Sequence, residues 1–253
     1  MVRYFVLIVG LIAAVGCNAQ PAKREVTVAA AANLSEVFQT LGPKFEAATG
    51  IHPVFSFAST AQLALQIENG APFDVYAAAD VSHVDGLEKK GLLVAHSRAL
   101  YATGILALWL PPGSPALGKV TKPEDLVDSG VKVIALAKPE LAPYGLAARE
   151  TLQKTGVWAK VEPKVVYADN INMTKQYGAS GNADVVFTAY SLVLKEAGKV
   201  IQVSAPSHAP IDQELGIVAA SKHQDTARAF ADYLLKGAGR EILRDAGYLV
   251  PGR

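Results

Sequence analysis

Short apolar runs alternate with amphipathic segments along most of the chain. Three runs of strand-forming or small residues occupy its first third: EVTVAAA at 25–31, HPVFSFA at 52–58 and DVYAAA at 74–79. Each is followed by a stretch with helical periodicity, at 34–48, 62–69 and 81–90. This order of strand and helix predicts a parallel sheet covered by helices.

This alternation of strands and helices is interrupted at 111–115, a stretch rich in proline and glycine, and resumes after it. The apolar strand GILALWLP precedes this break, and the predicted strands VKVIALA, EPKVVYA and ADVVFTA follow it. After a second loop-like stretch, SAPSHAPID, come the predicted strand ELGIVAA and helices at 226–235 and 240–245.

These two breaks predict an α/β protein of two lobes, joined by two crossovers around a ligand cleft. We expect a mixed, mostly parallel sheet in each lobe. The predicted divisions are 20–102 plus 207–253 for lobe 1 and 103–206 for lobe 2. The alternative to a return into lobe 1 is that the C-terminal segment forms a third small subdomain, which would have the same local pattern. Ligands favour clefts between lobes, so function is sought there.

Composition narrows the class of protein. Of the 253 residues, 51% are hydrophobic, which suffices for a core, and 24 Lys and Arg face 23 Asp and Glu. Because the net charge is only +1 and no long basic run occurs, we expect no nucleic-acid partner. The five histidines lack the spacing of a metal site and are interpreted as surface or packing residues: His52, His83, His96, His208 and His223.

The first 19 residues are typical of an export signal. A basic start at Arg3 precedes an apolar run, 4–16, that is too short to cross a membrane comfortably. Ala14-Val15-Gly16-Cys17 resembles the cleavage box of bacterial lipoproteins, in which the cysteine carries the lipid. Ordinary cleavage after Cys17-Asn18-Ala19 is the alternative. Cys17 is the only cysteine, so no disulfide forms within one chain.

Polar or small residues stand at four strand-to-helix junctions, where an open sheet binds ligands and helices present free N–H groups. The candidate residues, two junctions in each predicted lobe, are Asn33, Ser59 with Thr60, Tyr144, and Ile171. Each junction also has an ordinary interpretation, because Asn, Ser, Thr and Pro are the residues that any helix start prefers. Since no Lys or Arg occurs within the junctions, an anion bound there must be held by neutral donors and helix dipoles.

Catalytic motifs are weak by comparison. The stretch 113–120 has the glycine and lysine spacing of a phosphate-binding loop, but Pro115 removes an amide and Val120 replaces the metal-binding hydroxyl. No nucleophile elbow is present, and Asp74, Asp80 and Asp85 are interpreted as caps and turn residues. We therefore expect a binding protein and not an enzyme.

Three segments resemble the periplasmic molybdate-binding proteins of ABC importers: VTVAAAANLSEVF, FSFASTAQLALQIENGAPFDVYAAAD and ADNINMTKQYGASGNADVVFTAYS. The likeness extends over essentially the whole mature chain. It implies the type II periplasmic binding protein fold. Asn33 and Thr60 stand where many members have serine, and Ala189 stands where some have a ligand-contacting tyrosine; Tyr190 is one position away.

The resemblance implies that the side chains of Asn33 and Thr60 and the backbone of Tyr144 and Ile171 contact the oxygens of molybdate, not the metal itself. Ser59 is a neighbour, and the Tyr144 phenol is a further donor. We expect a monomer without cofactor, in the periplasm or on the outer face of the membrane, that delivers molybdate or tungstate to an ABC permease. The alternatives are a binding protein for sulfate or another small anion, an extracytoplasmic sensor, and a two-lobe enzyme.

Overall fold

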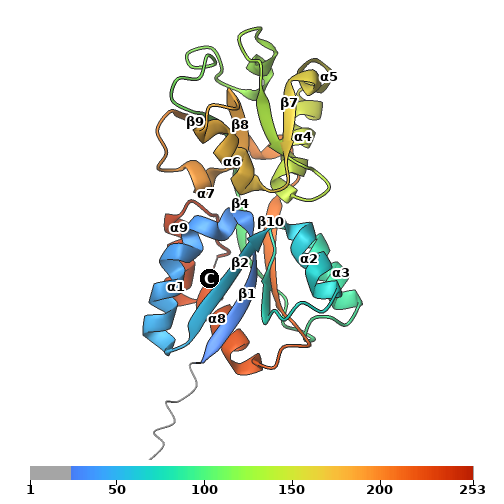
Figure 1. Ribbon diagram of the computed structural model, residues 1–253, viewed down its shortest axis with the longest axis vertical. Helices are drawn as coiled ribbons and strands as arrows, with labels where there is room; N and C mark the ends of the chain where they lie inside the picture. The colour runs from blue at the N-terminus through green and yellow to red at the C-terminus, as the bar shows by residue number, and fades with distance from the viewer. Residues whose placement is uncertain (1–23, 253) are drawn as a thin grey trace, which may run out of the picture.

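The computed structural model describes residues 24–252 and arranges them as two α/β lobes, one above the other (Figure 1). The predicted export signal and Cys17 lie outside the described residues. We call the part built on the first sheet lobe 1 and the part built on the second sheet lobe 2. The predicted two-lobe α/β fold is confirmed.

Lobe 1 contains a sheet with the strand order β2-β1-β3-β10-β4. Its strands are β1 (Glu25–Ala31), β2 (His52–Ala58), β3 (Val75–Ala77), β4 (Ala99–Gly104) and β10 (Ile211–Ile217). One face packs under α1 (Ser35–Thr49), α8 (Gln224–Leu235) and α9 (Gly237–Asp245). The other face packs under α2 (Thr60–Glu68) and α3 (Ser82–Lys89).

Lobe 2 repeats this plan, with the strand order β7-β6-β8-β5-β9. Its strands are β5 (Leu106–Leu110), β6 (Ile134–Ala137), β7 (Val165–Ala168), β8 (Val185–Ala189) and β9 (Lys199–Gln202). Its α-helices are α4 (Pro143–Lys154), α5 (Trp158–Val161), α6 (Ile171–Ala179) and α7 (Tyr190–Val193). Short 3₁₀ helices are η1 (Ala32–Leu34) in lobe 1, η2 (Pro123–Val127) and η3 (Glu162–Lys164) in lobe 2, and η4 (Ala205–Ser207) on the return to lobe 1.

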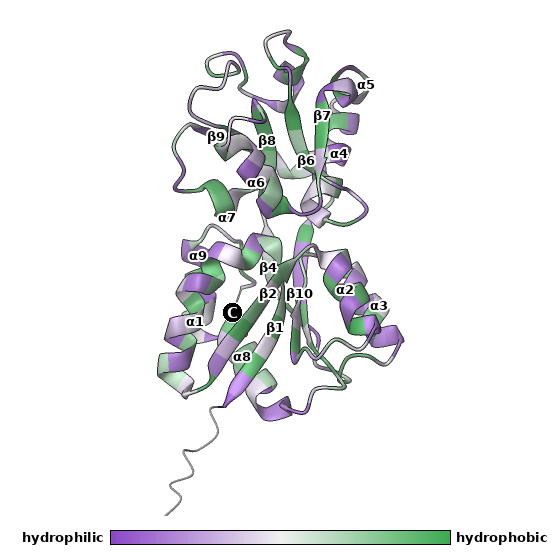
Figure 2. Cartoon of the chain, viewed as in Figure 1, coloured by the Kyte–Doolittle hydropathy of each residue, from purple (hydrophilic) through white to green (hydrophobic). Residues whose placement is uncertain are grey.

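Strand β5 shows why the lobe 2 sheet is apolar on both faces. Leu106, Leu108 and Leu110 point into the core that includes α4, while Ala107 and Trp109 point into the core on the opposite face. A strand buried on both sides needs a continuous apolar run, as its sequence has. Figure 2 shows the same effect in both lobes, where hydrophobic colour concentrates on the central strands.

Both sheets are mixed, but the parallel share is smaller than predicted. In lobe 1, β1 pairs in parallel with β2 and β3, whereas β10 is antiparallel to β3 and β4. In lobe 2, β6 pairs in parallel with β7 and β8, whereas β5 is antiparallel to β8 and β9. The antiparallel pairs arise where the chain crosses between lobes.

The two crossovers lie side by side. Strand β4 ends at Gly104 and β5 begins at Leu106, so Ile105 alone separates the two sheets. The chain returns through 203–210 to β10. The sequence predicted one strand at 104–111 and missed β4, because ALYATG ends in glycine and contains few β-branched residues.

No helix in residues 24–252 is long and apolar enough to cross a membrane.

Candidate functional site

The starts of η1, α2, α4 and α6 meet at a small cavity between the lobes. Its empty volume, which includes space open to solvent, is about 190 Å³. The cavity is lined by Ala31, Ala32, Asn33, Ser59, Thr60, Ala79, Ala142, Pro143, Tyr144 and Ile171. All five predicted site residues are therefore brought to one place.

Local sequence explains why the lobe 2 helices begin here. Pro143 occupies the first turn of α4, where its missing N–H is no loss. The side chain of Asn170 caps α6 by accepting from the N–H groups of Asn172 and Met173, at 3.1 and 3.0 Å. In α4, a Cβ on Gly145 would lie 2.1 Å from the carbonyl oxygen of Ala137, so only glycine lets this helix start so near β6.

Four backbone donors at the cavity have no protein partner within residues 24–252. Within the described residues, no acceptor is recorded for the N–H of Asn33, Thr60, Tyr144 or Ile171. The first N–H groups of a helix have no partner inside it, and they carry the positive end of the helix dipole. Four such groups around one cavity provide a site for an anion.

Three hydroxyl groups add donors of the same kind. Ser59 Oγ is buried and makes no hydrogen bond within the described chain. Thr60 Oγ1 accepts from the N–H of Ala79 at 3.1 Å, and Tyr144 Oη accepts from Gln213 Nε2 at 2.9 Å. Each of the three thus retains a proton to donate. Burial raises the pKa of the Tyr144 phenol well above its ordinary value, so it stays a donor at neutral pH.

Asn33 is engaged differently from the expectation. Its Nδ2 donates to Gln213 Oε1 at 3.0 Å and to Tyr248 Oη at 2.9 Å, which uses both amide protons. In this arrangement its backbone N–H, and not its side-chain amide, is left for a ligand.

Neither a basic group nor an acid lines the cavity. Asp169, the nearest acid in sequence to Ile171, pairs with Lys138 at 2.7 Å. Tyr190 lies against Gly247 and does not line the cavity. A ligand that fits must therefore accept hydrogen bonds from neutral donors and has no carboxylate to donate to. A fully ionised oxyanion has this chemistry.

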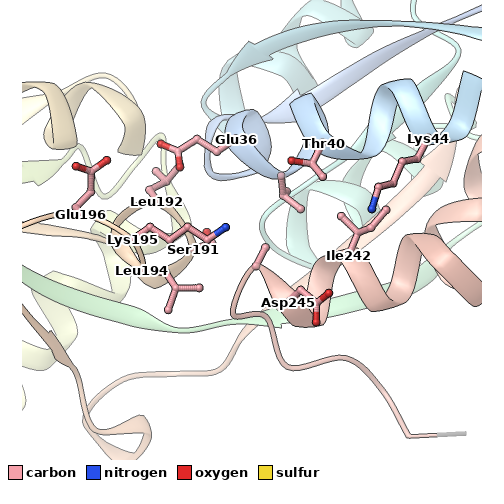
Figure 3. A pocket seen from close by; sticks show the side chains of 12 residues that line it. Glu36, Thr40, Lys44, Ser191, Leu192, Leu194, Lys195, Glu196, Ile242 and Asp245 are labelled. Atoms are coloured by element: carbon pink, nitrogen blue, oxygen red, sulfur yellow. The ribbon is translucent and has the colours of Figure 1, made fainter.

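A larger pocket, of about 750 Å³ of empty space, lies between α1 and α9 of lobe 1 and the α7 turn of lobe 2 (Figure 3). Its lining includes the acids Glu36, Glu196 and Asp245 together with Lys44 and Lys195. Glu36 and Glu196 are paired with Lys175, so charges of both signs meet in this pocket. The smaller cavity is lined by neutral donors and is the better candidate for an anion.

Histidines and acids form no metal cluster in the part of the chain that the structure describes. Three of the histidines instead lie against carboxylates: His52 against Glu46, His83 against Asp80, and His223 against Asp74. Hydrogen bonding to Asp80 raises the pKa of His83 above its ordinary value.

Sequence reasoning missed a buried polar group beneath the cavity, formed by Gln213 with Tyr101 and Tyr248. Gln213 accepts from Tyr101 Oη at 2.9 Å as well as from Asn33. One signal was available: alternation along β10 places Gln213 on the same face as Ile211 and Leu215, where an apolar residue is expected.

Comparison with known proteins places these features in a context. The family described as "Bacterial extracellular solute-binding protein" matches residues 26–249. The molybdate-binding protein ModA of Azotobacter vinelandii is 37% identical over 92% of this chain and 92% of its own length. ModA of Rhodobacter capsulatus is 35% identical over 89% of this chain and 88% of its own length. The solved structure titled "Azotobacter vinelandii periplasmic molybdate-binding protein" superposes with a TM-score of 0.85 at 29% identity, covering 90% of this chain and all of that one.

Proposed function

Because this chain belongs to the bacterial extracellular solute-binding proteins, we propose that it captures molybdate in the cavity between its lobes and delivers it to an ABC permease. One observation carries the proposal. Seven donors, four backbone N–H groups and three hydroxyls, belong to the residues that line a cavity without any basic side chain. An anion with four oxygens and no proton matches a site made only of donors.

The choice of molybdate rests on the relatives, which carry that name over nearly the full length of this chain. Tungstate has the same charge and shape, so we propose it as a second ligand. Sulfate is the alternative anion. The proposed contacts are the N–H groups of Asn33, Thr60, Tyr144 and Ile171 and the hydroxyls of Ser59, Thr60 and Tyr144.

Binding of this kind works by closure of the two lobes around the ligand. The N–H of Ala61, in the first turn of α2, donates to the carbonyl of Leu141 in lobe 2 at 3.2 Å. Ligand contacts made by both lobes favour this closed arrangement. We propose that the closed monomer is what the permease recognises, that Cys17 carries a lipid anchor, and that no reaction is catalysed.

The test is the thermal midpoint of the purified protein without the export signal, with molybdate, tungstate, sulfate and phosphate added separately. A ligand at about 100 times its Kd stabilises the folded state by about 2.7 kcal/mol, a rise of roughly 5–10 °C for this size of chain. We expect that rise with molybdate and tungstate. No rise with any of the four would overturn the oxyanion assignment. A rise with sulfate alone would identify sulfate, in place of molybdate, as the ligand.

A matched pair of variants locates the site. Thr60→Val keeps the shape of the side chain but removes its donor, so molybdate affinity should fall by a factor of about 10–150, the value of a hydrogen bond to a charged group. Ser180→Ala removes an exposed hydroxyl far from the cavity and should leave the affinity unchanged. Equal affinities in both variants would place the ligand elsewhere.

A further inference from the structure

Gln213 is fully buried on a strand where its neighbours on the same face, Ile211 and Leu215, are apolar. A buried carboxamide is costly unless its polar atoms are hydrogen bonded. Here they are: Oε1 accepts from Asn33 and Tyr101, and Nε2 donates to Tyr144. A leucine would satisfy an ordinary core position, so these bonds need another explanation.

The partners of Gln213 belong to both lobes. Asn33 is in lobe 1, and its backbone N–H is one of the donors at the cavity. Tyr144 is in lobe 2, and it lines the cavity from the opposite side. The bond from Gln213 to Tyr144 therefore crosses between the lobes and connects two segments that meet the same ligand.

The crossover itself is shaped to allow this contact. A Cβ on Gly104, the last residue of β4, would lie 2.1 Å from Tyr144 Oη and 2.5 Å from Gln213 Nε2. Any other residue at 104 would push the phenol and the carboxamide apart. The contact thus lies next to Ile105, where the chain passes from one sheet to the other.

A second bond between the lobes reaches the same asparagine. Ser191 of lobe 2 donates to Tyr248 Oη at 3.0 Å, and Tyr248 donates to the carbonyl of Asn33 at 2.9 Å. Asn33 is therefore held by two side chains, Gln213 and Tyr248, and each of them also bonds a hydroxyl of the opposite lobe. Opening the lobes must break both of these bonds.

We infer that Gln213 is a positioning residue that couples lobe closure to the anion site. In the closed arrangement it fixes the Asn33 segment and holds Tyr144 against it, so the donors of both lobes face one ligand. Separation of the lobes removes Tyr144 from Gln213 and Ser191 from Tyr248, while Asn33 keeps its bonds to Gln213 and Tyr248 within lobe 1. The effect is on how long the ligand is retained, because closure follows the first encounter. The ligand named here rests on the proposed function, whereas the coupling does not.

The test compares Gln213→Met, which keeps the length of the side chain without its hydrogen bonds, with Gln66→Met on the exposed face of α2 as the control. Association and dissociation of molybdate are followed by stopped-flow tryptophan fluorescence. Loss of one or two hydrogen bonds predicts dissociation that is about 5–25 times faster, with association changed less than about twofold. The control should behave as the wild type. Unchanged dissociation in Gln213→Met would overturn the inference.

A double-mutant cycle with Tyr144→Phe tests whether Gln213 acts through the phenol. If it does, the double variant should release molybdate little faster than the more affected single variant. Fully additive effects would mean that Gln213 and Tyr144 act separately, which contradicts the inference. A purely structural role for Gln213 predicts additivity together with a lowered thermal midpoint.

Amide hydrogen exchange at Ala61 provides a readout without ligand. This N–H lies in the first turn of α2, so its recorded acceptor is Leu141 of the opposite lobe, and its exchange reports lobe opening. Tyr144→Phe, which removes a single oxygen, and Gln213→Met should both accelerate exchange at Ala61 relative to amides inside β1. Unaltered exchange in both variants would refute the coupling. Faster exchange in a protein that binds none of the four anions would uphold the coupling and reject the proposed function.

Discussion

Ser59→Ala should stabilise the ligand-free protein and weaken anion binding at the same time. The hydroxyl of Ser59 is buried and has no hydrogen-bond partner in the described residues. It stands at the N-cap of α2 in a capping-box arrangement with Gln62, but its oxygen makes no hydrogen bond with the Gln62 N–H. Instead, Gln62 Oε1 accepts from the Ser59 N–H at 3.3 Å. Within the described residues, no protein group therefore pairs with this donor at the binding site.

The expected changes in stability and in affinity follow from this unpaired hydroxyl. A buried hydroxyl without a partner costs about 1–3 kcal/mol, so its removal should raise the free energy of unfolding by about 1 kcal/mol or more. The same hydroxyl, once it donates to a charged oxygen, is worth about 1.5–3 kcal/mol. Its removal should therefore raise the Kd for molybdate by a factor of about 10–150.

Urea denaturation of the ligand-free protein checks the expected gain in stability, and titration calorimetry with molybdate checks the expected loss of affinity. Asn170→Ala is the comparison, because that side chain does cap its helix, α6. Its removal should lower the free energy of unfolding by about 1 kcal/mol. A similar loss in Ser59→Ala would show that Ser59 also caps its helix. An unchanged Kd would show that the hydroxyl does not reach the anion.

Three further predictions concern the backbone, the donors and the surface. Gly145→Ala should lower the thermal midpoint and weaken binding, because the new Cβ meets the carbonyl of Ala137; a midpoint equal to the wild type would contradict the close approach. The Kd for molybdate should be constant from about pH 6 to about pH 9, because burial keeps the pKa of Tyr144 above that range; calorimetry showing a tenfold change would argue for a titrating ligand contact. Because the pKa of His83 is raised in the folded protein, its pairing with Asp80 stabilises the fold at pH values below the pKa of His83 in the unfolded chain. This stabilisation is lost as the pH rises through the pKa of His83 in the folded protein. His83→Gln should thus lower the free energy of unfolding by at most about 1 kcal/mol at about pH 5 and match the wild type at about pH 9 in urea denaturation, whereas a difference that grows with pH would be inconsistent.

The sequence predicted the fold, and brought the candidate site residues together, for the same physical reason. Parallel strands end at one edge of a sheet, so polar residues after β1 and β2 in lobe 1, and after β6 and β7 in lobe 2, come together at the helix starts. Local signals such as Pro143 and Asn170 are sufficient to mark these starts, because caps act within three residues.

The contacts beneath the cavity could not be predicted in this way. Asn33 meets Gln213 and Tyr248, which are 180 and 215 residues away along the chain. Such bonds depend on the return crossover bringing β10 beside β3, which no local pattern encodes. The same limit explains Ser59: its residue type indicates a helix cap, and only the packed structure shows that the hydroxyl is unused.

The place of β10 between β3 and β4 also determines the order in which the chain can acquire structure during synthesis. All five strands of the lobe 2 sheet lie between Leu106 and Gln202, so that sheet is complete before β10 emerges. The lobe 1 sheet has no link between β3 and β4 until Ile211–Ile217 arrives, and α8 and α9 follow later still. Strands β3 and β4 must therefore wait for the strand that joins them, which lies in about the last sixth of the chain. We expect a ribosome-bound chain ending near residue 205 to protect lobe 2 from proteases while the N-terminal segment is still cleaved.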